Sequence, residues 1–307
     1  MAKDVSAEQL ENALTASDAG DALGARVLPE TVTDLRRIMA ALSELANADP
    51  PDIGATVHES IPMDDGVTGM VVTPPGEGPF PVLCFLHGGG WVCGSPSDYR
   101  KLLLRFAEQG ILCVAPDYRL APEHPFPAPF EDCVSGFRWT ARECGRFRGG
   151  PGRVAIGGDS AGGNFAAAVA AALAGERDAP RAAALIYGAF DFALLDGVRG
   201  PTDELVARGN DISARAYLGD DRERLLDDPR VSPIHVADRL PPCHVVVGGA
   251  DRLTGQADAL VARLEASGVP YEHFVDAGMP HAYFQFEAAS AARLAIRRLC
   301  AFLHRTL

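Results

Sequence analysis

The most distinctive local pattern in the sequence is Gly158-Asp159-Ser160-Ala161-Gly162, a G-x-S-x-G motif. The apolar run VAIG leads into it, and the run NFAAAVAAALAG follows it with helical character. A strand, a sharp turn and a helix in this order present a serine hydroxyl above a sheet, at the positive end of the helix. Glycine is needed two residues before and after the serine, because the strained turn leaves no room for side chains. The motif predicts that Ser160 is a nucleophile, and a plain glycine-rich turn capped by a serine is the alternative.

A second glycine-rich segment, HGGGW at residues 87–91, directly follows the apolar run PVLCFL. Acyl transfer builds negative charge on a carbonyl oxygen, and backbone N–H donors that no side chain shields are suited to stabilise it. The N–H of Ala161, just after the nucleophile, would be a further donor. A phosphate-binding loop would need a lysine or G-x-G-x-x-G spacing, and neither is present. His87 has no second ligand at a useful spacing, so we interpret it as structural and predict no metal site.

A nucleophilic serine requires a base, and the base requires an acid that orients it. Catalytic side chains in open α/β sheets gather beyond the carboxyl ends of the strands. Four of the histidines after Ser160 lie in predicted strands, in a connecting stretch or in the last helix: His235, His244, His273 and His304. His281 lies in a loop just past the last predicted strand, and we therefore predict it to be the base.

The orienting acid is predicted to be Asp251, which directly follows the run CHVVVGGA. Asp276 is too close to the His281 loop to come from a different strand end. Asp191, after the run AAALIYGAF, is the serious rival. We favour Asp251 because its strand is adjacent in sequence to the strand of the histidine, and a helix N-cap is its alternative role.

Alternation of apolar runs and helical periodicity predicts a parallel sheet covered on both faces. The predicted strands are 67–73, 81–86, 111–116, 153–157, 182–187, 244–248 and 271–275, and the predicted helices are 97–109, 130–144, 162–174, 256–267 and 285–304. The turn Asp64-Asp65-Gly66 predicts an antiparallel edge hairpin within residues 57–73. Residues 1–48 show the spacing of one or two amphipathic helices, which end at Asp49-Pro50-Pro51.

Composition places the chain among globular proteins. Its 307 residues suit one large α/β domain, and 47% of them are hydrophobic. The net charge of −13 disfavours nucleic acid and anionic lipid surfaces as partners. Seven cysteines without a C-x-x-C pair predict buried free thiols and a reducing cytoplasm. No apolar stretch approaches the roughly 20 residues of a membrane span, and the first residues lack the apolar core of a signal peptide.

With these residues identified, the sequence resembles the bacterial hormone-sensitive-lipase-like esterases, in particular the branch named for its GDSAG motif. The resemblance runs from about residue 55 to the end. The matching residues are His87, Gly88, Gly89, Gly90 and Trp91, DYRLAPE at 117–123, Pro125 to Ala128, Gly158 to Gly163 including Asp159, Ser232-Pro233, Asp251 and His281. The chain departs from the family pattern at Gly188, Gly255, Gln256 and Ala282, and these departures bear on the shape of the acyl pocket.

The resemblance implies an α/β-hydrolase fold with a mostly parallel eight-stranded sheet, flanking helices and a helical cap. Residues 51–307 would form the catalytic domain, and residues 1–50 the N-terminal cap segment, with 192–218 contributing to the cap. It implies a cofactor-free serine carboxylesterase for short-chain acyl esters, a small-molecule substrate, and backbone donors from Gly89, Gly90 and Ala161. It also implies a homodimer formed through the last strand and helix.

Two other functions fit the same residues. An amide or thioester hydrolase, such as a deacetylase of a biosynthetic pathway, would use the same three side chains, and the sequence does not separate it from an esterase. A non-catalytic small-molecule receptor on the same fold is a function of a different class. Such receptors lack the catalytic histidine, whereas His281 is present here.

Overall fold

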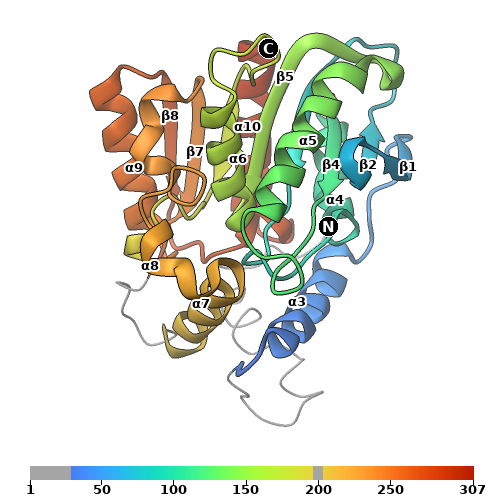
Figure 1. Cartoon of the computed structure of the whole chain (residues 1–307). Coiled ribbons are helices and arrows are strands. Elements are labelled where there is room, and N and C mark those ends of the chain that lie inside the picture. The colour runs from blue at the N-terminus through green and yellow to red at the C-terminus, as the bar shows by residue number, and fades with distance from the viewer. Residues whose placement is uncertain (1–28, 196–202) are drawn as a thin grey trace.

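The structure is a computed structural model that describes residues 29–195 and 203–307 (Figure 1). The described residues form an eight-stranded sheet in the order β1-β2-β4-β3-β5-β6-β7-β8. The strands are β1 (Thr56–Pro62), β2 (Thr68–Thr73), β3 (Phe80–Leu86), β4 (Leu112–Asp117), β5 (Gly149–Asp159), β6 (Ala183–Ile186), β7 (Cys243–Gly248) and β8 (Tyr271–Asp276). Only the pairs β1–β2 and β2–β4 are antiparallel, so the predicted α/β-hydrolase fold and its edge hairpin are confirmed.

The central strands are buried on both faces because their sequences are continuous apolar runs. In β3, residues 82–86 have no exposed surface, and β7 is buried throughout. The helices of the described chain are α3 (Val32–Asn47), α4 (Arg100–Glu108), α5 (Ala128–Glu143), α6 (Ala161–Ala172), α7 (Asp203–Leu218), α8 (Arg222–Leu225), α9 (Thr254–Ser267) and α10 (Ser290–Thr306). Figure 1 shows α5, α6 and α9 on one face of the sheet, with α4 and α10 behind it. Strands that have no polar face must be covered by apolar side chains on both sides, and these two layers of helices cover them.

The last predicted helix begins later than expected. The pattern predicts a start at residue 285, but Tyr283–Gln285 form a 3-10 turn and α10 starts at Ser290. The side chains of this turn have other partners: Tyr283 donates to Asp276, and Gln285 donates to Tyr99. Hydrogen bonds to the rest of the fold therefore override the local helical periodicity at this point.

Two helices cover the end of the sheet at which the parallel strands terminate. Figure 1 shows α3 and α7 together at that end, below α6 and the carboxyl end of β5. Their contact is close, since Leu35 Cδ2 lies 3.4 Å from the position that a Cβ at Gly209 would take. Helix α3 accounts for part of the predicted segment 1–50 and α7 for part of 192–218. Residues 1–28 and 196–202 of those segments lie outside the described residues.

All seven cysteines are free and buried, as predicted, and therefore pack as small apolar side chains. Across residues 29–195 and 203–307, no helix combines the length and the hydropathy that crossing a bilayer requires.

Candidate active site

Ser160 occupies a strained turn between β5 and α6. Its backbone angles are φ 53° and ψ −119°, a conformation that non-glycine residues rarely adopt. The strain is held by neighbours, because the Ser160 N–H donates to Ile186 O at 2.9 Å. A Cβ at Gly158 would lie 2.4 Å from Leu86 O, and one at Gly162 would lie 1.9 Å from the same atom. Both glycines of the motif are therefore required by the carboxyl end of β3, which the turn crosses at close range.

The structure brings His281 and Asp251 to this turn from two neighbouring strand ends. His281 Nε2 lies 2.9 Å from Ser160 Oγ, and His281 Nδ1 lies 2.7 Å from Asp251 Oδ2. The Asp251 side chain is fully buried, and its Oδ1 accepts the N–H of Leu253 at 2.8 Å. The carboxylate is therefore fixed by its own backbone turn and has one oxygen left for the imidazole. The three side chains form a continuous hydrogen-bonded chain, although they are distant in sequence.

The rival residues lie elsewhere. Asp191 accepts the N–H of Ala193 with its own side chain, and its backbone N–H donates to Gln256 Oε1 at 2.8 Å. Asp191 thus caps a short turn after β6, and Gln256, which departs from the family pattern, supports that turn. The ring of His235 is partly exposed and lies 3.6 Å from Asp227. Neither rival contacts Ser160.

The glycine loop presents unshielded donors beside the nucleophile. Gly89 and Gly90 have φ values of 124° and 59°, and a Cβ at Gly89 would lie 2.1 Å from Cys93 O. Within the described chain, no acceptor takes the N–H groups of Gly89, Gly90 or Ala161. A Cβ at Gly90 would lie 2.9 Å from Ser213 Oγ, so helix α7 closes over the loop. Three backbone donors therefore remain available at the turn, two on the loop and one at the start of α6.

The flanking residues of the loop are packed into the protein. His87 is buried and stacks on Tyr118 with ring centroids 4.2 Å apart, and burial lowers the pKa of His87 to about 4. A neutral, enclosed imidazole fits the predicted structural role. The Trp91 indole donates to Asn164 Oδ1 at 3.3 Å and stacks on Tyr217 of α7. The described residues contain no group of three or more potential metal ligands.

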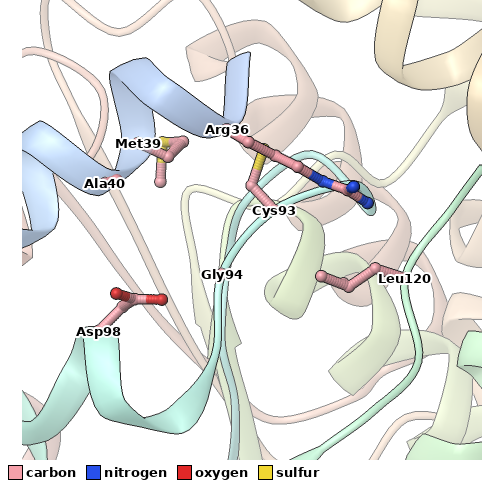
Figure 2. Close-up of a pocket in the computed structure, with 7 residues that line it drawn as sticks. All are labelled: Arg36, Met39, Ala40, Cys93, Gly94, Asp98 and Leu120. Carbon is pink, nitrogen blue, oxygen red and sulfur yellow. The ribbon is translucent and has the colours of Figure 1, made fainter. Parts of the chain in front are cut away.

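Sequence reasoning missed Arg36, which ties α3 to the glycine loop. Its guanidinium donates to Val92 O at 2.9 Å and to Ala121 O at 3.2 Å, and it pairs with Glu123. Figure 2 shows Arg36 beside Cys93 at one wall of a pocket of about 240 Å³. The other lining residues are Met39, Ala40, Gly94, Asp98 and Leu120. Helical periodicity marks which face of α3 is buried, but it does not say which loop that face meets.

Tyr187 is a second residue that the sequence did not reveal. It follows β6 with a positive φ of 36°, is fully buried, and meets the His281 ring edge-on at 4.9 Å between centroids. Its ring packs against the imidazole and limits its rotation. The unusual backbone angle is the signal of such a role, and it is visible only in the structure.

The fold and the three-residue chain define a hydrolase-type site, and comparison with known proteins identifies the family. A family model described as the α/β-hydrolase fold matches residues 83–285, and the chain belongs to that family and, within it, to the bacterial hormone-sensitive-lipase-like esterases. A solved esterase of the bacterial hormone-sensitive lipase family is 30% identical and has a TM-score of 0.79, with 98% of this chain and 97% of that chain covered. The ester hydrolase EH1AB1 from the Lake Arreo metagenome, solved with a phosphonate derivative, is 30% identical, with a TM-score of 0.84 and 96% and 97% covered.

Two curated relatives by sequence are also ester hydrolases by name. Carboxylic ester hydrolase LipN of Mycobacterium tuberculosis is 35% identical over 239 residues, which cover 71% of this chain. The match spans 62% of LipN, less than two thirds of its length. Ethyl acetate hydrolase of Pseudomonas putida is 31% identical over 255 residues, 78% of each protein.

Proposed function

We propose that the protein is a serine carboxylesterase that hydrolyses short-chain acyl esters through an acyl-enzyme. The observation that carries the proposal is the hydrogen-bonded chain from Ser160 Oγ through His281 to Asp251. With Asp251 ionised, His281 Nδ1 bears the proton and donates to the carboxylate. The lone pair of Nε2 then faces the serine hydroxyl, which is the arrangement that general-base catalysis requires.

In the first step, Ser160 Oγ attacks the ester carbonyl while His281 Nε2 takes the hydroxyl proton. The negative oxygen of the tetrahedral intermediate accepts from the N–H groups of Gly89, Gly90 and Ala161. The carbon–oxygen bond to the alcohol breaks, and His281 returns its proton to the leaving alkoxide. Water attacks the acyl-enzyme in the same way, with His281 again as base, and releases the acid.

Two observations support ester substrates with short acyl groups. The named activities of the relatives are ester hydrolysis, in one case of ethyl acetate. The rings of Trp91, Phe192 and Tyr217 pack together next to the glycine loop, with Trp91 and Phe192 centroids 4.7 Å apart. We infer that these large buried rings take up space under α7 that a long acyl chain would need. We propose α3 and α7 as parts of the cap that bounds the substrate pocket.

The test is a substrate panel on the purified protein and two serine variants. We expect turnover of p-nitrophenyl acetate and butyrate to exceed that of the octanoate, the matched anilide and a matched thioester. Ser160→Ala should lose about 10⁶-fold in kcat. Ser135→Ala, whose hydroxyl bonds Asp65 away from the site, should retain full activity. Turnover that survives in Ser160→Ala would refute the assignment, and faster anilide or thioester cleavage would favour the amide or thioester hydrolase.

Labelling separates an enzyme from a receptor. A p-nitrophenyl phosphonate should attach to Ser160 and release p-nitrophenol in proportion to the protein, because an activated serine attacks phosphorus as it attacks a carbonyl. Peptide mass analysis should locate the adduct on Ser160. A protein that binds small esters reversibly but takes no label would be a receptor.

A further inference from the structure

The carboxylate of Asp159 packs against Gly88, the first glycine of the glycine loop, and takes part in none of the steps above. It is buried and precedes the nucleophile in the chain. Its Oδ1 accepts the N–H of Gly88 at 2.8 Å, and its Oδ2 accepts the hydroxyl of Tyr99 at 3.0 Å. Gln285 Nε2 donates to Tyr99 Oη at 2.8 Å and lies 3.4 Å from Asp159 Oδ2. A hydrogen bond to a buried carboxylate therefore anchors the start of the loop that holds the proposed oxyanion donors.

The fit at this point is tight. A Cβ at Gly88 would lie 2.8 Å from Tyr99 Oη and 2.9 Å from Asp159 Oδ2. Only glycine leaves the carboxylate and the loop backbone close enough for their hydrogen bond. The next residue, Gly89, is one of the proposed donors, so a displacement at Gly88 is transmitted to the donors over a single peptide unit.

The charge state of Asp159 decides whether this arrangement persists. Its partners offer N–H and O–H groups, which suit an ionised carboxylate, and a protonated carboxyl would point its own hydrogen at them. Burial raises the pKa of Asp159 to about 6, although the hydrogen bond from Tyr99, the charge of His281 and the Gly88 N–H oppose the rise. The titratable groups that face it are Tyr99 from the turn before α4, Tyr118 after β4, Tyr187 after β6, and His281 after β8.

We propose that ionised Asp159 is a positioning residue for the oxyanion donors, so that its protonation releases Gly88 and lowers kcat with little change in KM. This inference rests on the function proposed above. Asp159 acts through the loop backbone and touches no reacting atom. The esterase is therefore expected to lose activity as Asp159 takes up a proton in acid.

Three variants test this. Asp159→Asn keeps the shape but removes the charge and one acceptor. Tyr99→Phe removes a donor that stabilises the ionised form of Asp159, and it also removes the second acceptor of the Gly88 N–H. Asp132→Asn is the matched control. Asp132 is also a buried aspartate, but it lies away from the site and pairs with Arg119 at 2.7 Å. For each variant, kcat and KM for p-nitrophenyl acetate are measured from pH 4.5 to 9, together with urea unfolding.

In the wild type, log kcat should fall as the pH drops below about 6, because Asp159 takes up a proton there. Asp159→Asn should lower kcat at pH 8 by about 10- to 100-fold with KM little changed, and its kcat should fall less steeply in acid than that of the wild type, because the side chain at position 159 no longer titrates. Tyr99→Phe should move the acid limb to higher pH, because the pKa of Asp159 rises when the hydrogen bond is lost. Asp132→Asn should unfold at lower urea with the pH profile unchanged.

The inference is overturned if Asp159→Asn keeps the wild-type kcat or if its kcat falls as steeply in acid as that of the wild type. It is also overturned if the acid limb of Tyr99→Phe stays in place or moves to lower pH. Active-site titration with the phosphonate distinguishes this failure from that of the proposed function. A wild type that takes the label at Ser160 but shows the results above loses only this inference, whereas an unlabelled wild type overturns both.

Discussion

Gly162→Ala is expected to damage both folding and catalysis, although alanine is the better helix former. The new Cβ would lie 1.9 Å from Leu86 O and 2.5 Å from His87 O. Non-bonded heavy atoms prefer separations of about 3.5 Å, so one backbone must move by roughly 1.5 Å. Both neighbouring atoms belong to backbone that cannot rotate away, which places the cost at the upper end of overpacking, about 3 kcal/mol. The segment that moves leads into the proposed oxyanion donors, and a shift of that size costs about 100-fold in kcat.

The matched control is Gly255→Ala. Gly255 is also the second residue of a helix, α9, and no atom of the described residues lies within 4 Å of the place that its new methyl group would take. Alanine there should raise the free energy of unfolding by up to about 1 kcal/mol and leave kcat unchanged. Urea unfolding and p-nitrophenyl butyrate turnover are measured for both variants. Gly162→Ala with wild-type stability and turnover would show that the close approach of β3 does not constrain the nucleophile turn.

The remaining predictions address the loop anchor, a buried histidine and the acid. Arg36→Ala should reduce kcat by about tenfold because Val92 O loses its donor, whereas Arg37→Ala, a largely exposed arginine one position along, should not. Burial lowers the pKa of His244 to about 4, so stability is lost as the pH falls from 6.5 towards 4, by at most about 3 kcal/mol. Relative to the wild type, the free energy of unfolding of His244→Phe, measured with urea, should therefore be raised more at pH 5 than at pH 8. Asp251→Asn should lower kcat by about 10⁴-fold, and Asp191→Asn, which still caps its turn, should match the wild type. An equal loss of kcat in Asp251→Asn and Asp191→Asn would contradict the assignment of Asp251, and not Asp191, as the acid that orients His281.

The parts of the fold that local sequence specifies were predicted well. Several of the seven strands named from the sequence are continuous apolar runs, because a strand buried on both faces needs such a run. The last of them, 271–275, contains a glutamate and a histidine, and β8 is only partly buried. The G-x-S-x-G turn was found because Gly158 and Gly162 are required by contacts at a single point, the carbonyl of Leu86. A position at which no Cβ atom fits must be glycine, so this kind of contact can be recognised in the sequence.

Residues that act through contacts distant in sequence could not be recognised in this way. Arg36, Tyr187 and Gln285 each contact the loop, the base or the partner of Asp159 across more than 50 positions of sequence. In the sequence they appear as an ordinary helix arginine, a strand-end tyrosine and a polar residue in a predicted helix. Their partners follow from the order of strands in the sheet, and no pattern of spacing within one segment encodes that order.

The choice between Asp251 and Asp191 shows what the strand order adds. Both residues follow the carboxyl ends of parallel strands, so position relative to a strand does not distinguish them. Strand β7 pairs directly with β8, with Gly248 opposite Asp276, whereas β6 is one strand further away. In this structure the carboxylate that reaches His281 Nδ1, while Nε2 faces Ser160, follows the strand beside that of His281. Sequence adjacency gave the correct neighbour because these last strands happen to be consecutive in the sheet.

The reaction centre and its substrate boundary are supported by different parts of the chain. Strands β3 and β5 are parallel neighbours, with Leu86 opposite Gly158, so their register fixes the glycine loop relative to Ser160. The bond from Gly88 to Asp159 joins the two strands again just past their ends. Helices α3 and α7 reach this centre from outside, through Arg36, Ser213 and Tyr217. Apart from Arg36, which anchors the loop, substitutions in the two helices should therefore change which esters are cleaved before they change how the bond is broken.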